Sequence, residues 1–179
     1  MGPGRQVAIA PGLMTRRLPP VKLVPATHRH RDFVRRLSAE VFSRFGDYDR
    51  TLPVLIQDSL VRTVVAQARD GAVGFAMYSP EDLPPGEIDL LAIAVTPEWQ
   101  SRGVGRFLLE HVETAARRLA PGGVTPCVRI TVAEDNRAAR SLFETSGYLR
   151  VPGEQSFYAG GQPSMAMCKR LAPLPGGES

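Results

Sequence analysis

One segment near the middle of the chain constrains the fold most, because it predicts a strand, a turn and a helix in immediate succession. Residues Ile88–Val95 form a nearly continuous apolar run, which is typical of a buried strand. After a polar turn, apolar residues recur at helical spacing from about Gly103 to Leu119, so this helix lays one face on a sheet. The pattern predicts a domain with a strand-turn-helix unit at its centre.

The flanking segments predict additional strands and helices. Before the central strand we expect a short strand, a helix capped by Thr27, a weaker helix and a hairpin, at residues 21–24, 27–42, 52–60 and 61–78. After the central helix we expect an alternating strand, a short helix ending at Gly147 and two last strands, at residues 128–132, 138–147, 148–151 and 164–171. The order of these elements predicts a mixed α/β fold.

Length and composition fit one globular domain. The chain has 179 residues, of which 43% are apolar and 22% charged, close to ordinary globular usage. Residues 1–19 and 172–179 are rich in Gly and Pro and lack apolar periodicity, so we expect flexible tails there. The folded domain is expected to span residues 20–171.

The charge pattern and hydropathy argue against nucleic-acid and membrane partners. The net charge is +4, and the basic residues are nearly all scattered arginines, since Lys22 and Lys169 are the two lysines. A nucleic-acid groove would need these charges clustered on one face. No stretch approaches the roughly 20 apolar residues that span a bilayer, and residues 1–20 lack a secretory apolar region. We therefore expect a cytoplasmic protein with no membrane and no nucleic-acid partner.

The cysteines and histidines do not predict a metal or a disulfide. Cys127 and Cys168 lie inside apolar runs, where buried free thiols are expected in a domain of this size. His28 and His30 flank an arginine, and no Cys or third His lies nearby to complete a metal shell. We expect no metal site.

The turn before the central helix contains two glycines, Gly103 and Gly105, which let backbone N–H groups face inward at a helix N-terminus. The helix dipole at that end favours anions, so the turn is suited to cradle a phosphate. The spacing matches neither the P-loop nor the full dinucleotide-binding pattern. From the turn alone, a purely structural role and a pyrophosphate site both remain open.

Two segments carry a family resemblance, because residues 93–109 and 136–148 resemble the signature stretches of the GNAT N-acetyltransferase superfamily. The first contains the Q-x-x-G-x-G pattern after a strand, and the second contains Asn136, Ala139, Leu142, Gly147 and Tyr148. The resemblance implies an α/β fold with a mixed, mostly antiparallel central sheet flanked by about four helices. It also implies a V-shaped split at the central strands.

The resemblance implies acetyl-CoA as co-substrate, bound in that split. The pantetheine arm is expected against the backbone of Ile93, Ala94 and Val95. The pyrophosphate is expected at the turn, with the candidate residues Gln100, Ser101, Arg102, Gly103, Val104, Gly105 and Arg106. Asn136 matches a residue that hydrogen-bonds the pantetheine arm, and it is an equally good helix N-cap.

The implied reaction is direct acetyl transfer to a primary amine of a small molecule or peptide. The amine must lose a proton before it attacks, so a carboxylate at the start of the central strand is the expected base. Glu87 and Asp89 are the candidates, and they point to one face of a strand because they are two residues apart. Glu87 fits the family position better, although a solvated strand-end carboxylate is the alternative. A backbone N–H of the central strand is expected to meet the oxyanion.

Phe143 departs from the family pattern, since it occupies the place of a tyrosine proposed to protonate the departing thiolate. A phenyl ring has no proton to donate, and the nearby Tyr148 resembles a buried core aromatic. The alternative function is therefore a catalytically weak acyl-CoA-binding sensor or scaffold with the same fold. The acceptor, the length of the acyl donor and a homodimer are left open. Asp47, Tyr48, Asp49 and Asp58 form either an attractive patch for a cationic amine or a solvated turn.

Overall fold

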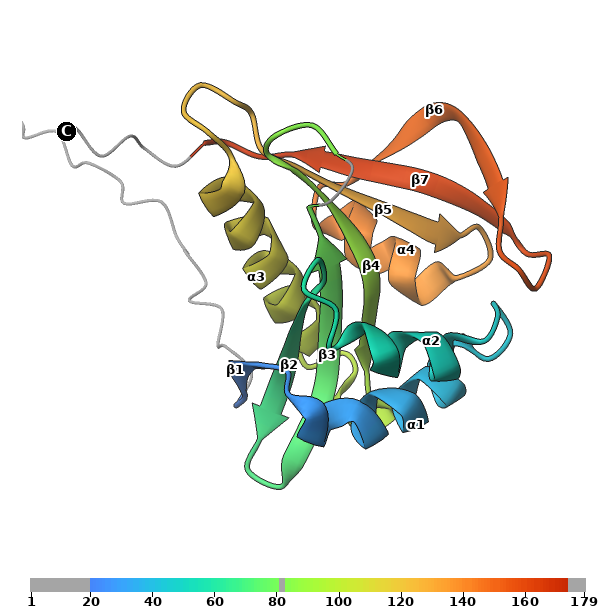
Figure 1. Cartoon of the computed structure of the whole chain (residues 1–179). Helices are drawn as coiled ribbons and strands as arrows, with labels where there is room; N and C mark the ends of the chain where they lie inside the picture. The colour runs from blue at the N-terminus through green and yellow to red at the C-terminus, as the bar shows by residue number, and fades with distance from the viewer. Residues whose placement is uncertain (1–19, 81–82, 174–179) are drawn as a thin grey trace, which may run out of the picture.

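The computed structural model describes residues 20–80 and 83–173, so nearly all of the two expected tails lies outside the described residues. Its centre is a seven-stranded sheet in the order β1-β2-β3-β4-β5-β7-β6 (Figure 1). The strands are β1 Lys22–Pro25, β2 Arg62–Ala68, β3 Gly71–Ser79, β4 Glu87–Val95, β5 Cys127–Ala133, β6 Leu149–Phe157 and β7 Pro163–Arg170. Neighbouring strands run antiparallel except β4 and β5, which are parallel. This confirms the expected mixed, mostly antiparallel sheet.

Within the described residues, four α-helices cover the two faces of the sheet: α1 Arg31–Phe42, α2 Tyr48–Leu55, α3 Val104–Leu119 and α4 Arg137–Thr145. Two short 3-10 helices, η1 His28–His30 and η2 Pro97–Trp99, precede α1 and α3. Buried residues of α1 and α2 pack on one face, against Val65, Phe75 and Met77. Buried residues of α3 and α4 pack on the other face in a separate and larger core cluster.

Helix α3 links the central strand to the second core, as its apolar spacing predicts. Its buried face includes Val104, Leu108, Val112 and Ala116, which recur every three or four residues. Gly103, directly before the helix, has φ +86°, a left-handed conformation that glycine adopts without strain. A tight turn at one end of β4 thereby joins η2 to α3.

Two predicted boundaries were wrong. The weak helix expected at 52–60 is α2 at Tyr48–Leu55, because its first turn forms on Asp47, whose carbonyl accepts the Thr51 hydroxyl at 3.0 Å. Residues after the helix form a turn in which the Asp58 carboxylate accepts the Leu60 N–H at 2.9 Å. The strand expected at 148–151 runs from Leu149 to Phe157, with its pairing to β7 interrupted between residues 150 and 155.

Strand β4 carries a bulge at Leu91. Against β3, Met77 pairs with Ala92 and Tyr78 with Leu90, so the residue between them has no cross-strand partner. Pairing with β5 ends at the same point, because the last registered pair is Leu90 with Ile130. A bulge bends and twists the strand that contains it. Beyond Leu91 the two parallel strands therefore diverge, which confirms the V-shaped split (Figure 1).

Candidate active site

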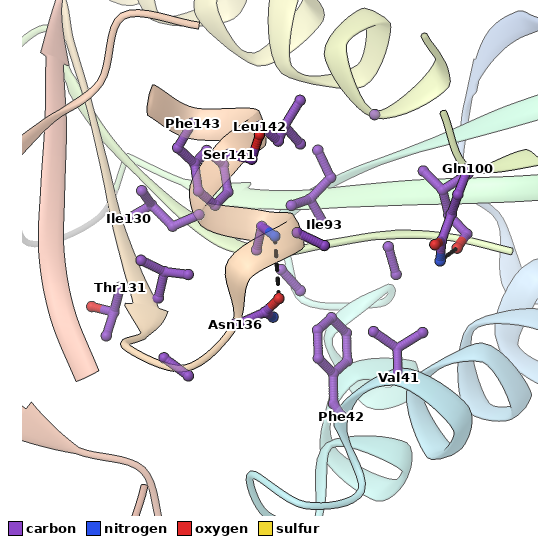
Figure 2. A pocket seen from close by; sticks show the side chains of 18 of the residues that line it. Val41, Phe42, Ile93, Gln100, Ile130, Thr131, Asn136, Ser141, Leu142 and Phe143 are labelled. Carbon is purple, nitrogen blue, oxygen red and sulfur yellow. Dashed lines mark hydrogen bonds between the residues drawn. The ribbon is translucent and has the colours of Figure 1, made fainter. Parts of the chain in front are cut away.

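A cleft of about 620 Å³ opens where β4 and β5 diverge. Its walls come from the second half of β4, the end of β5, the turn before α3, helix α4 and the ends of α1 and α2. Figure 2 shows Phe42 of α1 and Asn136, which directly precedes α4, on facing sides of it. The candidate residues that line it are Ile93, Ala94, Val95, Gln100, Ser101, Gly103, Gly105, Arg106, Asn136 and Phe143.

The backbone of β4 presents hydrogen-bonding groups to this cleft. The Thr96 N–H donates to the Val73 carbonyl of β3 at 2.9 Å. Because backbone groups alternate in direction along a strand, those of Ile93 and Val95 face away from β3, toward the split. At the outer end, the Gln100 side-chain Nε2 donates to the Val95 carbonyl at 3.0 Å. An extended ligand that carries amides can pair with this edge as a further strand does.

The turn before α3 brings backbone N–H groups to one end of the cleft. Ser101 and Gly103 both have left-handed backbone conformations, with φ +58° and +86°. The N–H groups of the first turn of a helix have no partner within the helix and carry the positive end of its dipole. A Cβ on Gly105 would lie 3.3 Å from Cδ2 of Leu142, so α4 approaches this turn closely. These features fit the predicted phosphate cradle.

Two of the turn's candidates do not line the cleft. The Arg102 guanidinium lies over the Trp99 ring, 5.3 Å from its centroid, and the residue is exposed. Val104 is buried in the core beneath the helix. By contrast, Arg106 lines the cleft and its Nη2 donates to the carbonyl and hydroxyl oxygens of Thr145 at 3.0 and 3.2 Å. Arg106 thus ties α3 to α4 beside the cradle.

Asn136 has the geometry for both of its predicted roles. Its Oδ1 accepts the Ala139 N–H at 3.1 Å, which makes it the N-cap of α4 (Figure 2). The same side chain lines the cleft, so its Nδ2 is placed to donate to a bound ligand.

Phe143 is part of the cleft wall and part of the core. It is 1% exposed and its ring meets Tyr148 edge-on, with centroids 5.6 Å apart. Tyr148 is itself buried, which confirms it as a core aromatic. Within the described structure, neither Phe143 nor Tyr148 therefore supplies the hydroxyl that the family pattern places at residue 143.

Glu87 and Asp89 lie outside the cleft lining, at the paired end of β4. Glu87 is in register with Cys127 of β5 and lies four residues before Leu91, about 13 Å along an extended strand. Asp89 is in register with Arg129, whose Nε is 4.0 Å from its Oδ1. The role of either carboxylate as the base stays a prediction. From this position, a carboxylate could take the proton of the amine only through intervening water.

An aromatic cluster at the other end of the cleft was missed by sequence reasoning, apart from the mention of Tyr48. It consists of Phe42, Phe45, Tyr48 and Tyr158, and we call it the aromatic compartment. The rings of Phe45 and Tyr158 lie 4.9 Å apart, and those of Tyr48 and Tyr158 lie 6.4 Å apart. The Tyr158 hydroxyl donates to the Thr131 carbonyl at 2.9 Å. Burial, with a smaller contribution from Tyr48, raises the pKa of Tyr158 to about 12, so its hydroxyl stays protonated at neutral pH.

The segment between α1 and α2 closes over this compartment. The Gly160 N–H donates to the Phe45 carbonyl at 3.2 Å, and Gln162 Nε2 donates to the Arg44 carbonyl. The Arg44 guanidinium binds both carboxylate oxygens of Asp135 at 2.9 and 3.0 Å. The first half of the sheet is thus bridged to the β6–β7 turn and to the loop after β5.

The remaining candidates, apart from Tyr48, lie outside the cleft lining. Of the four residues considered for attracting a cation, Tyr48 alone is among the residues lining the cleft. The His30 ring accepts the Thr27 N–H at 2.9 Å at the start of η1. Within residues 20–80 and 83–173, no group of three potential ligands could hold a metal, and no helix is long and apolar enough to cross a membrane. Cys127 and Cys168 are free thiols, the first buried and the second half-buried.

Comparison with known proteins agrees with this geometry. A relative from Mycobacterium tuberculosis, "N-alpha-acetyltransferase RimI", is 38% identical over 94 residues, covering 51% of this chain and 55% of that protein. A "L-2,4-diaminobutyric acid acetyltransferase" from Nocardia farcinica is 33% identical over 81 residues, covering 45% and 40%. The matches thus span about half or less of these curated relatives' lengths.

Solved structures share the fold. A GNAT-family acetyltransferase structure from Desulfovibrio desulfuricans superposes with a TM-score of 0.72 at 22% identity, covering 85% of this chain and 99% of that one. The ribosomal-protein-S18-alanine N-acetyltransferase from Escherichia coli gives a TM-score of 0.69 at 20% identity, covering 87% and 96%. The family model described as "Acetyltransferase (GNAT) family" matches residues 28–148, which include the split strands, the glycine turn and α4. The chain belongs to the acetyltransferase (GNAT) family.

Proposed function

We propose that this protein transfers the acetyl group of acetyl-CoA to a primary amine of a small molecule or peptide by direct attack. The observation that carries the proposal is the single cleft that joins the glycine turn of α3 to the diverging edge of β4. One end offers backbone N–H groups to a pyrophosphate, and the middle offers a strand edge to the amides of a pantetheine arm.

Two groups of described residues are candidates for contacting acetyl-CoA, one for its pantetheine arm and one for its pyrophosphate. The candidates for the pantetheine arm are the backbone of Ile93 and Val95 together with the Asn136 side chain. The candidates for the pyrophosphate are the N–H groups that follow Gly103, with Arg106 beside them. The close approach of Leu142 to Gly105 leaves little room there for a side chain, so a glycine at this position lets α4 pack closely against the first turn of α3 beside the cleft.

The reaction places its charge changes in the middle of the cleft. The amine nitrogen attacks the thioester carbon, the new C–N bond forms and the C–S bond breaks, so the amine loses a proton and the thiolate gains one. A backbone N–H near the Leu91 bulge is suited to stabilise the oxyanion, because the bulge lies where β4 leaves β5. If Glu87 or Asp89 removes the proton of the amine, the proton must pass through a chain of water molecules, because both carboxylates lie outside the cleft lining.

The acetyl group must leave CoA without help from residue 143, since Phe143 carries no hydroxyl. A thiol has a pKa of about 8.5, so its anion is a moderately good leaving group and solvent can protonate it. The same residue supports the second candidate function, an acyl-CoA-binding sensor or scaffold with weak turnover. Both functions require acyl-CoA binding, and only the first requires amine-dependent release of the thiol.

One experiment separates the two functions. Purified protein is titrated calorimetrically with acetyl-CoA, and free thiol is then followed with a panel of peptides, amino-acid amides and polyamines. We expect binding and thiol release that depends on at least one amine, with the acetylated product confirmed by mass spectrometry. Binding without amine-dependent release would favour the sensor, and absence of binding would contradict both. Repeating the titration with longer acyl-CoA donors identifies the acyl group.

A further inference from the structure

The aromatic compartment lies at the end of the cleft away from the glycine turn, where an acceptor must reach the thioester. Its walls are Phe42 and Phe45 from the end of α1 and the segment after it, Tyr48 from α2, and Tyr158 before the β6–β7 turn. The segment that contains Phe45 is held over it by two hydrogen bonds from the β6–β7 turn, one from the Gly160 N–H and one from the Gln162 side chain. Phe45 is buried and the other three rings are half-buried, so the compartment is a largely apolar part of the open cleft.

No acidic residue is found among the described residues that line the cleft. The nearby carboxylate of Asp135 is bound at two points by Arg44, so the cation of this pair already offsets its charge in part. Arg106, the one charged residue in the described lining, is a cation and lies at the cradle. Asp47 and Asp49, which flank Tyr48 in the sequence, lie outside the described lining. A protonated amine in the compartment therefore contacts no carboxylate among the described lining residues.

Aromatic rings attract cations, and this effect must be weighed against the missing countercharge. The Arg44 guanidinium already lies over the Phe45 ring, 4.5 Å from its centroid, so a second cation there would meet a like charge. Cation–π attraction is small compared with the cost of removing an ammonium group from water. Cation–π attraction would also favour the protonated form of the amine, which is not nucleophilic.

Desolvation therefore favours amines that are uncharged in a large fraction before they bind. An α-amino group has a pKa of about 8, and an alkylamine of the lysine type has one of about 10.4. At pH 7 their neutral fractions differ by roughly 10²-fold. The aromatic walls in addition favour an apolar group next to the amine.

We propose that the acceptor is the α-amino group of a peptide or amino-acid amide whose first side chain is apolar, and that polyamines and lysine side chains are poor acceptors. The inference rests on the proposed acetyl transfer and names its substrate class. It is carried by the aromatic walls, the pairing of Asp135 with Arg44 and the absence of acidic residues from the described lining.

A matched pair of acceptors tests the proposal on the whole protein. L-phenylalaninamide and 3-phenylpropylamine both carry a phenyl group on a short chain, and the α-carboxamide of the first lowers the pKa of its amine. At pH 7 we expect kcat/KM to be about 10²-fold higher for the amide, and the ratio to shrink as the pH rises to 9. Spermidine is expected to be poorer still. Equal or higher kcat/KM for spermidine or phenylpropylamine at pH 7 would overturn the inference while leaving acetyl transfer intact.

Failure of the proposed function has a different result. If acetyl-CoA binds and no acceptor in the panel releases thiol, acetyl transfer itself is contradicted, and the inference with it. If phenylalaninamide and glycinamide are acetylated at equal kcat/KM, acetyl transfer stands and the apolar preference of the compartment is contradicted.

A charge placed in the compartment provides the second test. Tyr48→Glu puts a carboxylate in its wall and is expected to raise the ratio of spermidine to phenylalaninamide turnover at least tenfold. Tyr48→Gln controls for the lost ring, and Val54→Glu controls for the added charge, since Val54 is on the same helix, 58% exposed and outside the cleft lining. An unchanged ratio in a Tyr48→Glu protein with native circular dichroism would contradict the role of charge. If that variant does not fold, the matched acceptor pair on the unaltered protein decides.

Discussion

Arg44 and Asp135, which are 91 positions apart in the sequence, form a two-point ion pair with N–O distances of 2.9 and 3.0 Å. Arg44 follows α1 on one side of the split, and Asp135 follows β5 on the other. The pair therefore bridges the two arms of the sheet at the end where they diverge. Its position makes it a determinant of the shape of the cleft.

The ion pair is expected to matter more for the acceptor than for stability. Both side chains are about half exposed, and exposed pairs contribute roughly 0–1 kcal/mol. A double-mutant cycle of Arg44→Gln and Asp135→Asn, measured by urea unfolding, should give a coupling energy below about 1 kcal/mol. The same variants should raise the KM of the acceptor several-fold, because the segment over the compartment loses an anchor. A coupling above 2 kcal/mol with an unchanged KM would show a purely structural pair.

Replacing Gly105 with Val should weaken acetyl-CoA binding at least tenfold. Its Cβ alone would lie 3.3 Å from Leu142 and 3.8 Å from Val95, so the added methyl groups must displace a cleft wall. Calorimetric titration measures the change, and circular dichroism checks the fold. Gly122→Val is the matched control, because a Cβ there meets nothing within 4 Å. Unchanged affinity in the Gly105 variant would contradict the position of the phosphate cradle.

The parts of the fold that depend on local periodicity were predictable from the sequence. The apolar run at 88–95 and the helical spacing from residue 104 gave β4 and α3 nearly to the residue. The glycine turn between them was recognised because a helix N-terminus and a left-handed glycine are encoded within a few positions. The bulge at Leu91 was not predicted, since the run that contains it has no Gly or Pro, and its one polar residue, Asp89, lies two positions before the bulge.

The acceptor end of the cleft depends on contacts between distant segments, which periodicity does not report. Phe45 and Tyr158 are separated by more than a hundred residues and meet because the β6–β7 turn folds back over the end of α1. Likewise, the placement of Glu87 outside the cleft follows from the register of β4 with β5. The pattern of a single strand does not specify its register with a neighbouring strand, so the distance from each carboxylate to the split could not be predicted.

Replacing Phe143 with Tyr tests whether residue 143 reaches the departing thiolate. The ring is 1% exposed and contacts Tyr148, so we expect the added hydroxyl to be buried without a partner and to cost about 1–3 kcal/mol. Melting temperature and single-turnover rate should be measured on the same variant. A lower melting temperature with an unchanged rate is the expected result. A rate increase approaching 10²-fold would instead place the ring edge at the CoA sulfur.

The Cys127 thiol should resist alkylation in the folded protein. Burial, with smaller contributions from Cys168 and Glu87, raises its pKa from 9.0 to about 11, so the thiolate fraction at pH 8 falls by roughly 10²-fold. Iodoacetamide labelling followed by mass spectrometry should modify Cys127 far more slowly in native protein than in urea. Because the folded pKa exceeds the unfolded one, this thiol's contribution to stability is complete below pH 9. It is lost as the pH rises through 11. Equal labelling rates in native and unfolded protein would contradict the burial.

Replacing Glu87 with Gln distinguishes two routes for the acceptor's proton. A water chain to Glu87 predicts a loss of about 10²-fold in turnover at pH 6–7 that shrinks as free amine accumulates at higher pH. Loss of the proton to solvent before binding predicts turnover within about threefold of the unaltered protein from pH 6 to 9. We expect the second result with an α-amine acceptor, because Glu87 lies at the paired end of β4 and no described residue of the cleft lining is acidic. The control is Asp89→Asn, which removes the other carboxylate on that face of the strand. A 10²-fold loss confined to the Glu87 variant, with acetyl-CoA affinity unchanged, would establish the relay and would open the site to alkylamines of high pKa.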